Sequence, residues 1–378
     1  MKVLALIESA DHVCFRYRLN ALAWAMAERG LYLEAMPLAK RLLPRLGQLA
    51  AAARADLVIL QRRLLPRWQL RLLRRLCRRL VYDLDDAMFR RDSFSPRGNL
   101  SSMRLGRFRT IVRAADAVLA GNDYLRQYAA AYTDPRRVYL VPTCVEPGWY
   151  RPALHARTGP MVRLAWIGQR AVLPSLACAG GQLAAAAAAL PGLQLRLICD
   201  VAPAHLPVRV VLRPWSSATE ADELAESDIG ISWLVDDLWS PGKCGLKVLQ
   251  YMAAGLPVVA NPVGIHRCFV VDGVTGFLAE TPAEWARAIT RLAADPALRN
   301  RMGAAARQRV TDEYGVQQWG PRLAAVLDAV AHGQPGSLHM PGGQADSGEH
   351  RARPCCLAPG RPGPPAQSPA GEPRPGRL

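Results

Sequence analysis

The stretch Trp239–Gly276 reads WSPGKCGLKVLQYMAAGLPVVANPVGIHRCFVVDGVTG, and it decides the fold of this 378-residue chain. Ser240 can cap a helix whose first residue is Pro241, because serine caps helices well and proline suits their first turn. Gly255 can end that helix. The apolar run that follows, Leu256–Ala260, has the length and composition of a buried strand. The stretch therefore predicts a helix followed directly by a strand, as in α/β proteins.

One face of the expected helix is polar and cationic. Lys243, Lys247 and Gln250 are spaced i, i+4 and i+7 and would form one stripe. The neighbouring stripe is apolar and must face the sheet; it consists of Leu246, Leu249 and Ala253. Two ammonium groups and the positive end of a helix dipole would then point to one place, which suits a pyrophosphate. Taken alone, the pattern fits two ordinary surface lysines better.

Strand and helix patterns alternate along the chain on both sides of this stretch, which indicates parallel sheets and an α/β fold. The expected strands are Lys2–Ile7, Asp56–Gln61, Leu80–Leu84, Ala117–Ala120, Arg137–Val141, Val162–Ile167, Gln194–Cys199, Arg209–Leu212, Asp228–Ser232 and Leu256–Ala260. The other expected helices are Val13–Arg29, Pro66–Arg79, Met103–Ala115, one from Asn122, Ala283–Ala294, Ala297–Glu313 and Val316–Val330.

Composition along the chain predicts two domains with a linker and a tail. Residues 1–145 form a first α/β domain, and residues 146–160, with three prolines and two glycines, form a linker. Residues 161–315 form a second α/β domain, and residues 316–330 form a final helix. Residues 331–378 are rich in proline and glycine, so we expect this tail to be disordered.

The chain is strongly basic, with 48 Lys and Arg against 31 Asp and Glu and a net charge of +17. The segment from Lys40 to Tyr82 holds twelve basic residues and one acid, Asp56. These arginines fit the solvated face of a core-packed helix, and they equally fit a docking surface for an anionic membrane. Nucleic acid is disfavoured as a partner, because only Trp68 interleaves the basic run with an aromatic ring.

Several classes of protein are excluded by what the sequence lacks. The apolar run within Met1–Glu8 is too short for a signal peptide or a membrane span. The nine cysteines follow no CxxC or Cys/His ligand spacing, which fits reduced thiols and a cytoplasmic location. No G-x-S-x-G elbow, G-x-G-x-x-G fingerprint after the first strand or G-x-x-x-x-G-K-[ST] loop occurs. Hydrolase triads, dinucleotide binding and ATP hydrolysis are therefore not supported.

An ordered set of motifs resembles one family of enzymes. LKVLQYMAAGLPVVANPVG and the later DGVTGFLAE resemble the donor-binding half of glycosyltransferase family 4, the group 1 glycosyl transferases. WIGQR at Trp166–Arg170 and DIGISWLVDDLWSPGKCG at Asp228–Gly245 extend the resemblance. YDLDDAMF at Tyr82–Phe89 and AADAVLAGNDYL at Ala114–Leu125 extend it more weakly. The resemblance implies a GT-B fold, in which two Rossmann-like domains with parallel sheets face each other across a cleft.

The same resemblance implies a retaining transfer of a sugar from a nucleotide-sugar to an acceptor, without a cofactor or a metal. The acceptor, whether lipid-linked or a polysaccharide, would bind to the first domain, at the membrane's cytoplasmic face if the basic segment docks there. Gly168 and Arg170 occupy the family's loop near the donor diphosphate, Lys247 matches a basic position, and Lys243 lies nearby. Gln250 occupies the position of the acid that binds the ribose. The resemblance implies no firmly required protein general base, so no catalytic residue is assigned.

The sequence departs from the family at two acidic positions. Family members commonly carry two glutamates eight residues apart, and here these positions fall on Gly242 and Gln250. An amide offers one neutral acceptor, so we expect Gln250 to bind a ribose weakly and a restored glutamate to keep or improve affinity. Asp236 or Asp237 could replace the first glutamate as a sugar ligand. The departure also leaves two alternatives, a catalytically silent nucleotide-sugar-binding or scaffold protein and a sugar-nucleotide epimerase.

Polar residues also follow two strands of the expected first domain. Asp83, Asp85 and Asp86 form a D-x-D-D cluster, which resembles a metal site of a different glycosyltransferase class with another fold. We therefore expect no metal, and instead expect the carboxylates to line the interdomain cleft or to cap the next segment, since sites in parallel sheets lie at carboxyl strand ends. In the cleft, Asp85 and Asp86 would be candidates for acceptor contact. His12 follows the first strand at a similar position and is a further candidate for acceptor contact.

Overall fold

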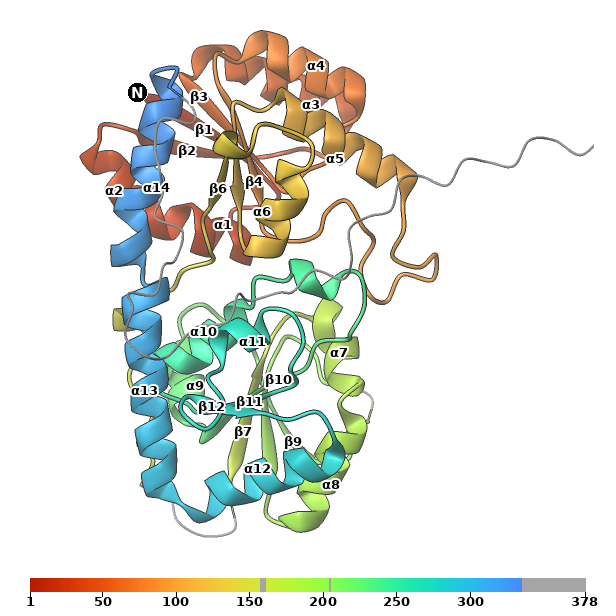
Figure 1. Cartoon of the computed structure of the whole chain (residues 1–378), viewed down its shortest axis with the longest axis vertical. Helices are drawn as coiled ribbons and strands as arrows, with labels where there is room; N and C mark the ends of the chain where they lie inside the picture. Colours follow the sequence, from red (N-terminus) through yellow and green to blue (C-terminus); the bar gives the residue numbers. More distant parts are fainter. Residues whose placement is uncertain (157–160, 204, 335–378) are drawn as a thin grey trace, which may run out of the picture.

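The computed structural model describes residues 1–156, 161–203 and 205–334, which form two α/β domains that follow each other along the long axis of the molecule (Figure 1). The first contains a 6-stranded sheet in the order β2-β1-β3-β4-β5-β6, and the second a 6-stranded sheet in the order β12-β11-β10-β7-β8-β9. Within each sheet, neighbouring strands pair in parallel.

The strands of the first sheet are β1 Lys2–Ile7, β2 Tyr32–Pro37, β3 Leu57–Gln61, β4 Leu80–Leu84, β5 Ala117–Ala120 and β6 Val138–Leu140. Those of the second are β7 Arg163–Ile167, β8 Gln194–Ile198, β9 Arg209–Arg213, β10 Ile229–Ser232, β11 Val258–Ala260 and β12 Gly276–Leu278. The expected strands are all present with small differences at their ends, and β2 and β12 were not expected.

The first domain contains the helices α1 Val13–Arg18, α2 Ala23–Glu28, α3 Leu42–Ala51, α4 Arg67–Leu76, α5 Ser102–Ala114 and α6 Asp123–Ala130. The remaining helices are α7 Leu173–Ala177, α8 Gly180–Ala189, α9 Glu220–Ala225, α10 Leu246–Ala253, α11 His266–Phe269, α12 Pro282–Ala294, α13 Pro296–Tyr314 and α14 Val316–Ala331. Short 3₁₀ helices are η1 Asn20–Leu22, η2 Ala52–Arg54, η3 Pro135–Arg137, η4 Pro147–Trp149, η5 Arg170–Val172 and η6 Ser240–Gly242.

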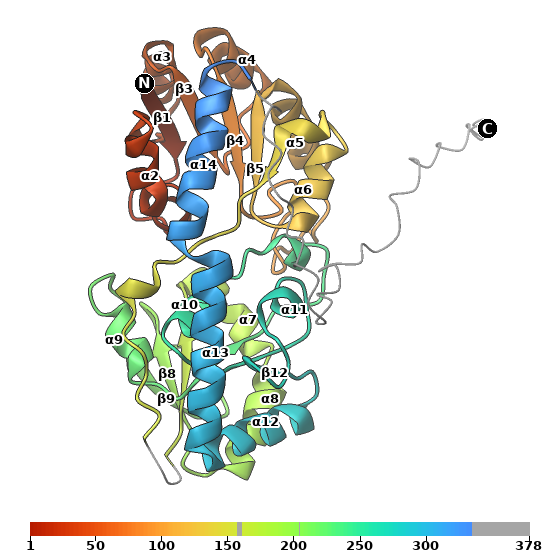
Figure 2. The same ribbon diagram turned by 60° about the vertical axis from the view of Figure 1, so that its left-hand side comes forward.

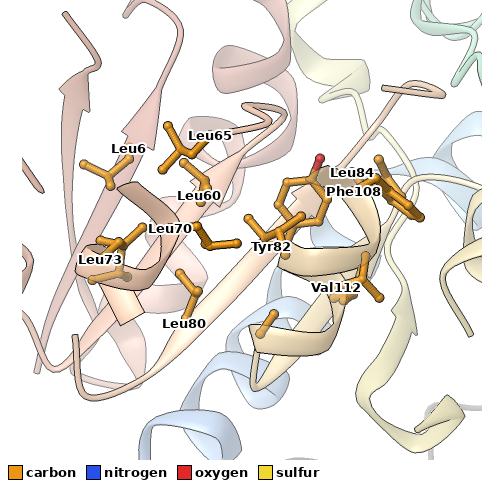
Figure 3. Packing of buried hydrophobic residues seen from close by; sticks show 14 of the residues in the cluster. Leu6, Leu60, Leu65, Leu70, Leu73, Leu80, Tyr82, Leu84, Phe108 and Val112 are labelled. Atoms are coloured by element: carbon orange, nitrogen blue, oxygen red, sulfur yellow. The ribbon is translucent and has the colours of Figure 1, made fainter. Parts of the chain in front are cut away.

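Leucines and aromatic rings fill the core between the first sheet and the helices α4 and α5 (Figure 3). The labelled members are Leu6, Leu60, Leu65, Leu70, Leu73, Leu80, Tyr82, Leu84, Phe108 and Val112. They are each at most 5% exposed, and burying one leucine of this kind contributes about 1.5–3 kcal/mol. This packing holds the carboxyl ends of β3 and β4 in fixed positions, which matters because the candidate residues follow those strands.

The final helix packs against the first domain rather than the second. Trp319 and Leu323 of α14 share a core with Val3 and Ala5 of β1. In Figure 2, α13 runs along the second domain and α14 continues along the first, so the two helices connect the domains at one side. The tail expected from residue 331 onwards begins in the last turn of α14, and residues 335–378 lie outside the described residues.

The segment between the domains is packed rather than free. Tyr150 is 1% exposed and Ala153 is 9% exposed, and both join the core around α10. Arg307 of α13 donates to the carbonyl oxygens of Tyr150 and Pro147, each at 2.8 Å. Residues 157–160 of the expected linker lie outside the described residues.

Two sequence expectations for helices are wrong in detail. The single helix expected over Val13–Arg29 is divided into α1, η1 and α2, because Leu19 and Leu22 leave regular helical geometry. The expected helix Pro66–Arg79 is shorter at both ends and spans Arg67–Leu76. Within the described part of the chain, no single helix is long and apolar enough to cross a membrane, and one bent pair, Arg170–Ala177 with Gly180–Ala189, passes that test by length and composition only.

Candidate functional site

The strand order of the second sheet reverses between β7 and β10, and ligands of parallel α/β sheets bind at such a point. Gly168 follows β7 directly, and a Cβ there would lie 2.7 Å from the Trp166 ring, so only glycine fits. Arg170 follows in η5 with its side chain exposed. The loop after β10 carries Asp236 and Asp237. Two predicted donor residues, Gly168 and Arg170, therefore follow one strand at the reversal point, and the two candidate sugar ligands follow the other.

The helix that carries the candidate lysine begins later than the sequence predicts. Gly245 has a φ of 64°, and a Cβ there would lie 2.7 Å from the ring of Phe269, so the chain turns at this glycine and α10 starts at Leu246. Ser240 and Pro241 belong to η6 instead. The expected stripe is therefore wrong for Lys243, which precedes the helix in extended conformation.

Lys247 lies on the first turn of α10 with its ammonium over an aromatic ring. Its Nζ is 4.0 Å from the centroid of the Trp166 ring, a cation–π contact. Burial, together with a smaller effect of the Lys243 charge, lowers the pKa of Lys247 to about 7. No carboxylate is paired with Lys247 among the residues that the structure describes. A half-buried lysine with a lowered pKa and without an acidic partner is characteristic of a functional site.

A buried serine–histidine pair lies near enough to Lys247 to sense its charge. Ser232 Oγ lies 2.8 Å from His266 Nε2, and His266 Nδ1 lies 2.9 Å from the Asn261 carbonyl oxygen. Burial lowers the pKa of His266 to about 4, and the Lys247 charge contributes. His266 is therefore neutral near pH 7, with Nδ1–H donating to Asn261 and Nε2 accepting from Ser232. Both side chains are at most 2% exposed, so the pair is structural rather than a nucleophile with its base.

Lys243 contacts the first domain. Its Nζ lies 3.2 Å from Asp86 Oδ1 and 5.1 Å from the centroid of the Trp239 ring. Asn122 of the first domain donates to the carbonyl oxygens of Lys243 and Pro241, each at 3.0 Å. The segment before α10 is therefore held against the first domain, and Lys243 bridges the two domains while Lys247 stays in the second.

Gln250, at the expected ribose position, is almost fully buried. It is 4% exposed, and its Nε2 donates to the hydroxyls of Tyr17 at 3.1 Å and Tyr150 at 3.2 Å. The Tyr17 hydroxyl donates to Glu220 Oε1 at 2.7 Å. Because Tyr17 belongs to α1 of the first domain, this network also crosses between the domains.

The two aspartates proposed as sugar ligands differ in their surroundings. Asp236 is exposed. Asp237 Oδ1 accepts from the backbone N–H groups of Trp239 and Ser240 at 3.0 and 2.9 Å, and its Oδ2 accepts from Asn99 Nδ2 at 3.1 Å. Burial raises the pKa of Asp237, but hydrogen bonds led by the Ser240 backbone outweigh this and hold it below its ordinary value. Asp237 is thus committed to its own loop and to the first domain.

Gly242, where the family's first glutamate falls, leaves no room for a side chain. A Cβ at Gly242 would lie 2.6 Å from both the Cβ and the backbone nitrogen of Ala87, in the loop after β4. Real Cβ atoms essentially never approach backbone atoms so closely. A glutamate at 242 is therefore incompatible with the observed contact between the domains.

The aspartate cluster of the first domain is paired with arginines. Asp83 is buried and accepts from Arg18 Nη2 at 2.6 Å. Arg62 Nη1 lies 2.9 Å from Asp85 Oδ1, and its Nη2 lies 3.0 Å from Asp86 Oδ2. Arg62 has a φ of 59°, a left-handed conformation that costs a non-glycine residue about 1–3 kcal/mol. In this conformation the guanidinium pairs with Asp85 and Asp86, and Asp86 also contacts Lys243 in the segment before α10.

His12 lies beside this cluster at the end of β1. Its Nδ1 accepts from the Cys14 backbone N–H at 3.2 Å and so caps α1. Its Nε2 lies 3.9 Å from Glu8. Burial lowers the pKa of His12, and the charge of Arg62 adds to the effect. His12, Asp85 and Asp86, the candidates for acceptor contact, therefore lie at one edge of the first sheet.

Sequence reasoning missed the groups that surround Gln250. Tyr17 is 233 positions and Tyr150 is 100 positions from Gln250 in the sequence, and Glu220 is 203 positions from Tyr17. None of them belongs to a motif, and each is buried, so only the folded chain brings them together.

One segment of the second domain matches a family of known proteins. Residues 239–309 match the family described as Glycosyl transferases group 1. D-inositol 3-phosphate glycosyltransferase of Streptomyces bingchenggensis (strain BCW-1) is 35% identical over 135 residues, which is 35% of this chain and 28% of that protein. Alpha-maltose-1-phosphate synthase of Mycobacterium tuberculosis (strain CDC 1551 / Oshkosh) is 30% identical over 250 residues, which is 54% of this chain and 61% of that protein. The chain thus spans less than two thirds of these relatives.

Solved structures share the fold over most of the chain. Anabaena HepE in complex with UDP and glucose superposes with a TM-score of 0.64 at 16% identity, covering 87% of this chain and 100% of that chain. Sucrose-phosphate synthase from Thermosynechococcus elongatus superposes with a TM-score of 0.67 at 17% identity, covering 88% and 99%. The expected resemblance is thus confirmed by the match of residues 239–309 to the group 1 glycosyl transferases, and the chain has the expected two-domain GT-B fold.

Proposed function

We propose that the chain is a glycosyltransferase that moves a sugar from a nucleotide-sugar to an acceptor, with retention of configuration at the transferred carbon. The observation that carries the proposal is the unpaired Lys247 ammonium at the strand-order reversal point, inside the segment that matches the family. The bound nucleotides of solved neighbours support a nucleotide-sugar as donor, since HepE is described in complex with UDP and with UDP-glucose.

The chemistry follows from where charge develops. As the glycosidic bond breaks, negative charge grows on the leaving diphosphate. Lys247, the exposed Arg170 and the backbone at Gly168 can stabilise that charge, and losing one such donor typically costs about 10²–10³ in rate. These cations support a reaction without a metal, and we name no catalytic base, as in the resembled family.

The acceptor would contact the edge of the first sheet. Asp85 and Asp86 lie there beside Arg62, and Lys243 reaches Asp86 from the other domain. An acceptor hydroxyl could bind to these carboxylates. This assignment rests on their place at the carboxyl ends of β4 and its neighbours, opposite the donor residues.

One observation favours the non-catalytic alternative, a protein that binds a nucleotide-sugar but does not transfer its sugar. Gly242 carries no carboxylate to hold the sugar hydroxyls, and Ala87 fills the space where one would lie. Asp237 is committed to other partners, so only the exposed Asp236 is free to take over among the described residues proposed for this role.

Mass spectrometry after incubation with a panel of nucleotide-sugars and a lipid and glycan extract tests the proposal. We expect a glycosylated product with wild-type protein and none with Arg170→Ala/Lys247→Met. Arg287→Ala, on the exposed side of α12, is the control for loss of positive charge. Donor that binds but stays unchanged would support the silent alternative, an epimerised donor would support an epimerase, and absence of nucleotide binding would overturn the site.

We also propose that the first domain docks on anionic lipid, which would bring the enzyme to a lipid-linked acceptor. The helices α3 and α4 lie side by side (Figure 1). Leu43 of α3 is 81% exposed and Trp68 of α4 is 49% exposed. The exposed positions of α4 also include Arg67, Arg71 and Arg75 at four-residue spacing. Apolar side chains surrounded by arginines are typical of surfaces that insert among charged lipid headgroups.

Vesicle co-sedimentation tests this docking. Wild-type protein should bind vesicles that contain phosphatidylglycerol but not pure phosphatidylcholine, and the binding should fall as salt rises, because exposed charges are screened. Each arginine near the membrane surface contributes about 1 kcal/mol, so Arg67→Gln/Arg71→Gln/Arg75→Gln should abolish sedimentation. A variant with the same charge change in the second domain, at Arg287, Arg291 and Arg301, should bind like wild type. Equal binding to both kinds of vesicle would refute the proposal.

A further inference from the structure

Glu220 is a buried carboxylate that the proposed reaction does not use. It is 3% exposed and lies at the start of α9. Arg16 Nη2 lies 2.9 Å from its Oε1, and Trp215 Nε1 donates to its Oε2 at 2.8 Å. Its third partner is the Tyr17 hydroxyl at 2.7 Å. Since carboxylates only accept hydrogen bonds when ionised, all three partners must donate to Glu220.

The protons of the two tyrosines are therefore assigned. A hydroxyl has one proton, and that of Tyr17 goes to Glu220. The Tyr17 and Tyr150 oxygens are 2.7 Å apart, so Tyr150 must be the donor between them. Neither hydroxyl then has a proton left for Gln250, and only the amide Nε2 can face them, as observed at 3.1 and 3.2 Å. The Gln250 carbonyl oxygen consequently points away from the tyrosines.

We propose that Glu220 is a positioning residue of the nucleotide site, which through Tyr17 and Tyr150 orients Gln250 so that its Oε1 accepts a hydrogen bond from a hydroxyl of the donor ribose. The inference rests on the proposed function, because it assigns a ligand to the same site. Oε1 takes part in no hydrogen bond recorded among the described residues, so it remains available as an acceptor. The carboxylate that the family carries at position 250 has its counterpart here at Glu220, two hydrogen bonds away.

The same proton count explains why glutamate is unsuitable at position 250. A carboxylate there would face two hydroxyl oxygens whose protons are already donated, to Glu220 and to Tyr17. It would be buried with no donor and near a second carboxylate, which costs the ionised form much free energy. The proton count therefore predicts the opposite of the sequence expectation, in which a restored glutamate keeps or improves affinity.

A double-mutant cycle on stability tests the network without any ligand. Gln250→Glu should lower the melting temperature by about 2–5 °C, since a buried acceptor is left without a donor. In a Tyr17→Phe background, the Tyr150 hydroxyl no longer donates to Tyr17 and can donate to a glutamate at position 250. Gln250→Glu should then lower the melting temperature by less than half as much as it does in the wild-type background. Tyr132→Phe, which removes a hydroxyl bonded to Arg109 elsewhere in the first domain, should give no such rescue.

Nucleotide selectivity provides the readout that a purely structural role would not move. Calorimetry would compare UDP, ADP and GDP, then the 2′-fluoro and 3′-fluoro analogues of whichever binds, because fluorine cannot donate a hydrogen bond. Wild-type protein should bind one fluoro analogue about 3- to 10-fold more weakly. Tyr17→Phe lets the Gln250 amide turn its Nε2 toward the ligand. The ratio of the affinity for the natural nucleotide to that for the fluoro analogue should then fall to about 2-fold or less. Tyr17→Phe/Gln250→Glu should restore it.

The possible outcomes separate the two ideas. If a nucleotide binds and Tyr17→Phe leaves the fluoro ratio unchanged, the positioning role of Glu220 is wrong and the proposed function stands. If none of the three nucleotides binds, the proposed function is wrong. Independently of nucleotide binding, additive effects of Tyr17→Phe and Gln250→Glu on stability would overturn the proton network. Rescue in both cycles supports the proposal.

Discussion

Nucleotide affinity should fall steeply with pH because one lysine must gain a proton to bind a diphosphate. In the free protein, burial lowers the pKa of Lys247 to about 7, so much of it is neutral near physiological pH. A bound diphosphate would favour the ammonium and return this pKa toward its ordinary value of about 10.4. Binding therefore takes up a proton at every pH between these two values.

The size of the effect follows from the two pKa values. The protonated fraction of Lys247 in the free protein falls from about one quarter at about pH 7.5 to about one hundredth at about pH 9. Affinity should therefore fall about 25-fold over this interval, which is about 1.9 kcal/mol. The interval lies above the second pKa of a phosphate, about 6, so the charge of the ligand stays nearly constant.

Calorimetry in two buffers of different ionisation enthalpy measures both the affinity and the proton uptake. Wild-type protein should take up about 0.9 proton per nucleoside diphosphate at about pH 8. Lys247→Met keeps the contact with Trp166 but cannot titrate, so both the uptake and the pH dependence should disappear. An affinity that stays constant from about pH 7.5 to about pH 9, with no proton uptake, would refute the assignment of Lys247 to the diphosphate.

Three further changes test the fold around the site. Without nucleotide, Lys247 binds a proton more readily in the unfolded chain than in the folded protein between about pH 7 and about pH 10.4. The free energy of unfolding should therefore rise with pH in this window. Urea titrations should show a smaller rise for Lys247→Met. Arg18→Met leaves the buried Asp83 carboxylate with Gln61 as its remaining side-chain partner and should cost about 3–5 kcal/mol, much of which Arg18→Met/Asp83→Leu should recover. Truncation after residue 334 should leave the melting temperature unchanged, and a drop of more than a few degrees would mean that the removed residues pack on the domains.

The overall fold was predictable because local patterns agree with it. The buried strands are short apolar runs that alternate with helical spacing, and that periodicity is visible without a structure. The strand Tyr32–Pro37 was missed because it lies at the edge of its sheet, where its residues are only half buried or exposed. The helix start at Leu246 was missed because Ser240 and Pro241 resemble a cap and first turn. Packing of Gly245 against Phe269 overrides that local preference.

The candidate site was predictable only where one motif carries it. Lys247, Gln250 and Gly168 lie in the motifs, and the structure places Gly168 directly after β7 and the other two on α10. The environment that determines their chemistry comes from elsewhere: Tyr17 from α1, Glu220 from α9, and Tyr150 from the segment between the domains. Such contacts between distant residues leave no periodic signal in one sequence, so Gln250 looked like a weakened glutamate rather than a required amide.

The two departures from the family pattern share one physical cause. Gly242 is needed because Ala87 of the first domain lies against its Cα, and Gln250 is needed because Tyr17 of the first domain has no proton to offer it. Each position lies in the second domain, and each constraint comes from the first. A glutamate at either position would therefore act against the closed arrangement of the domains before it could act on a sugar. The second domain of this chain is thus adapted to the first, and both departures follow from how closely the two domains meet.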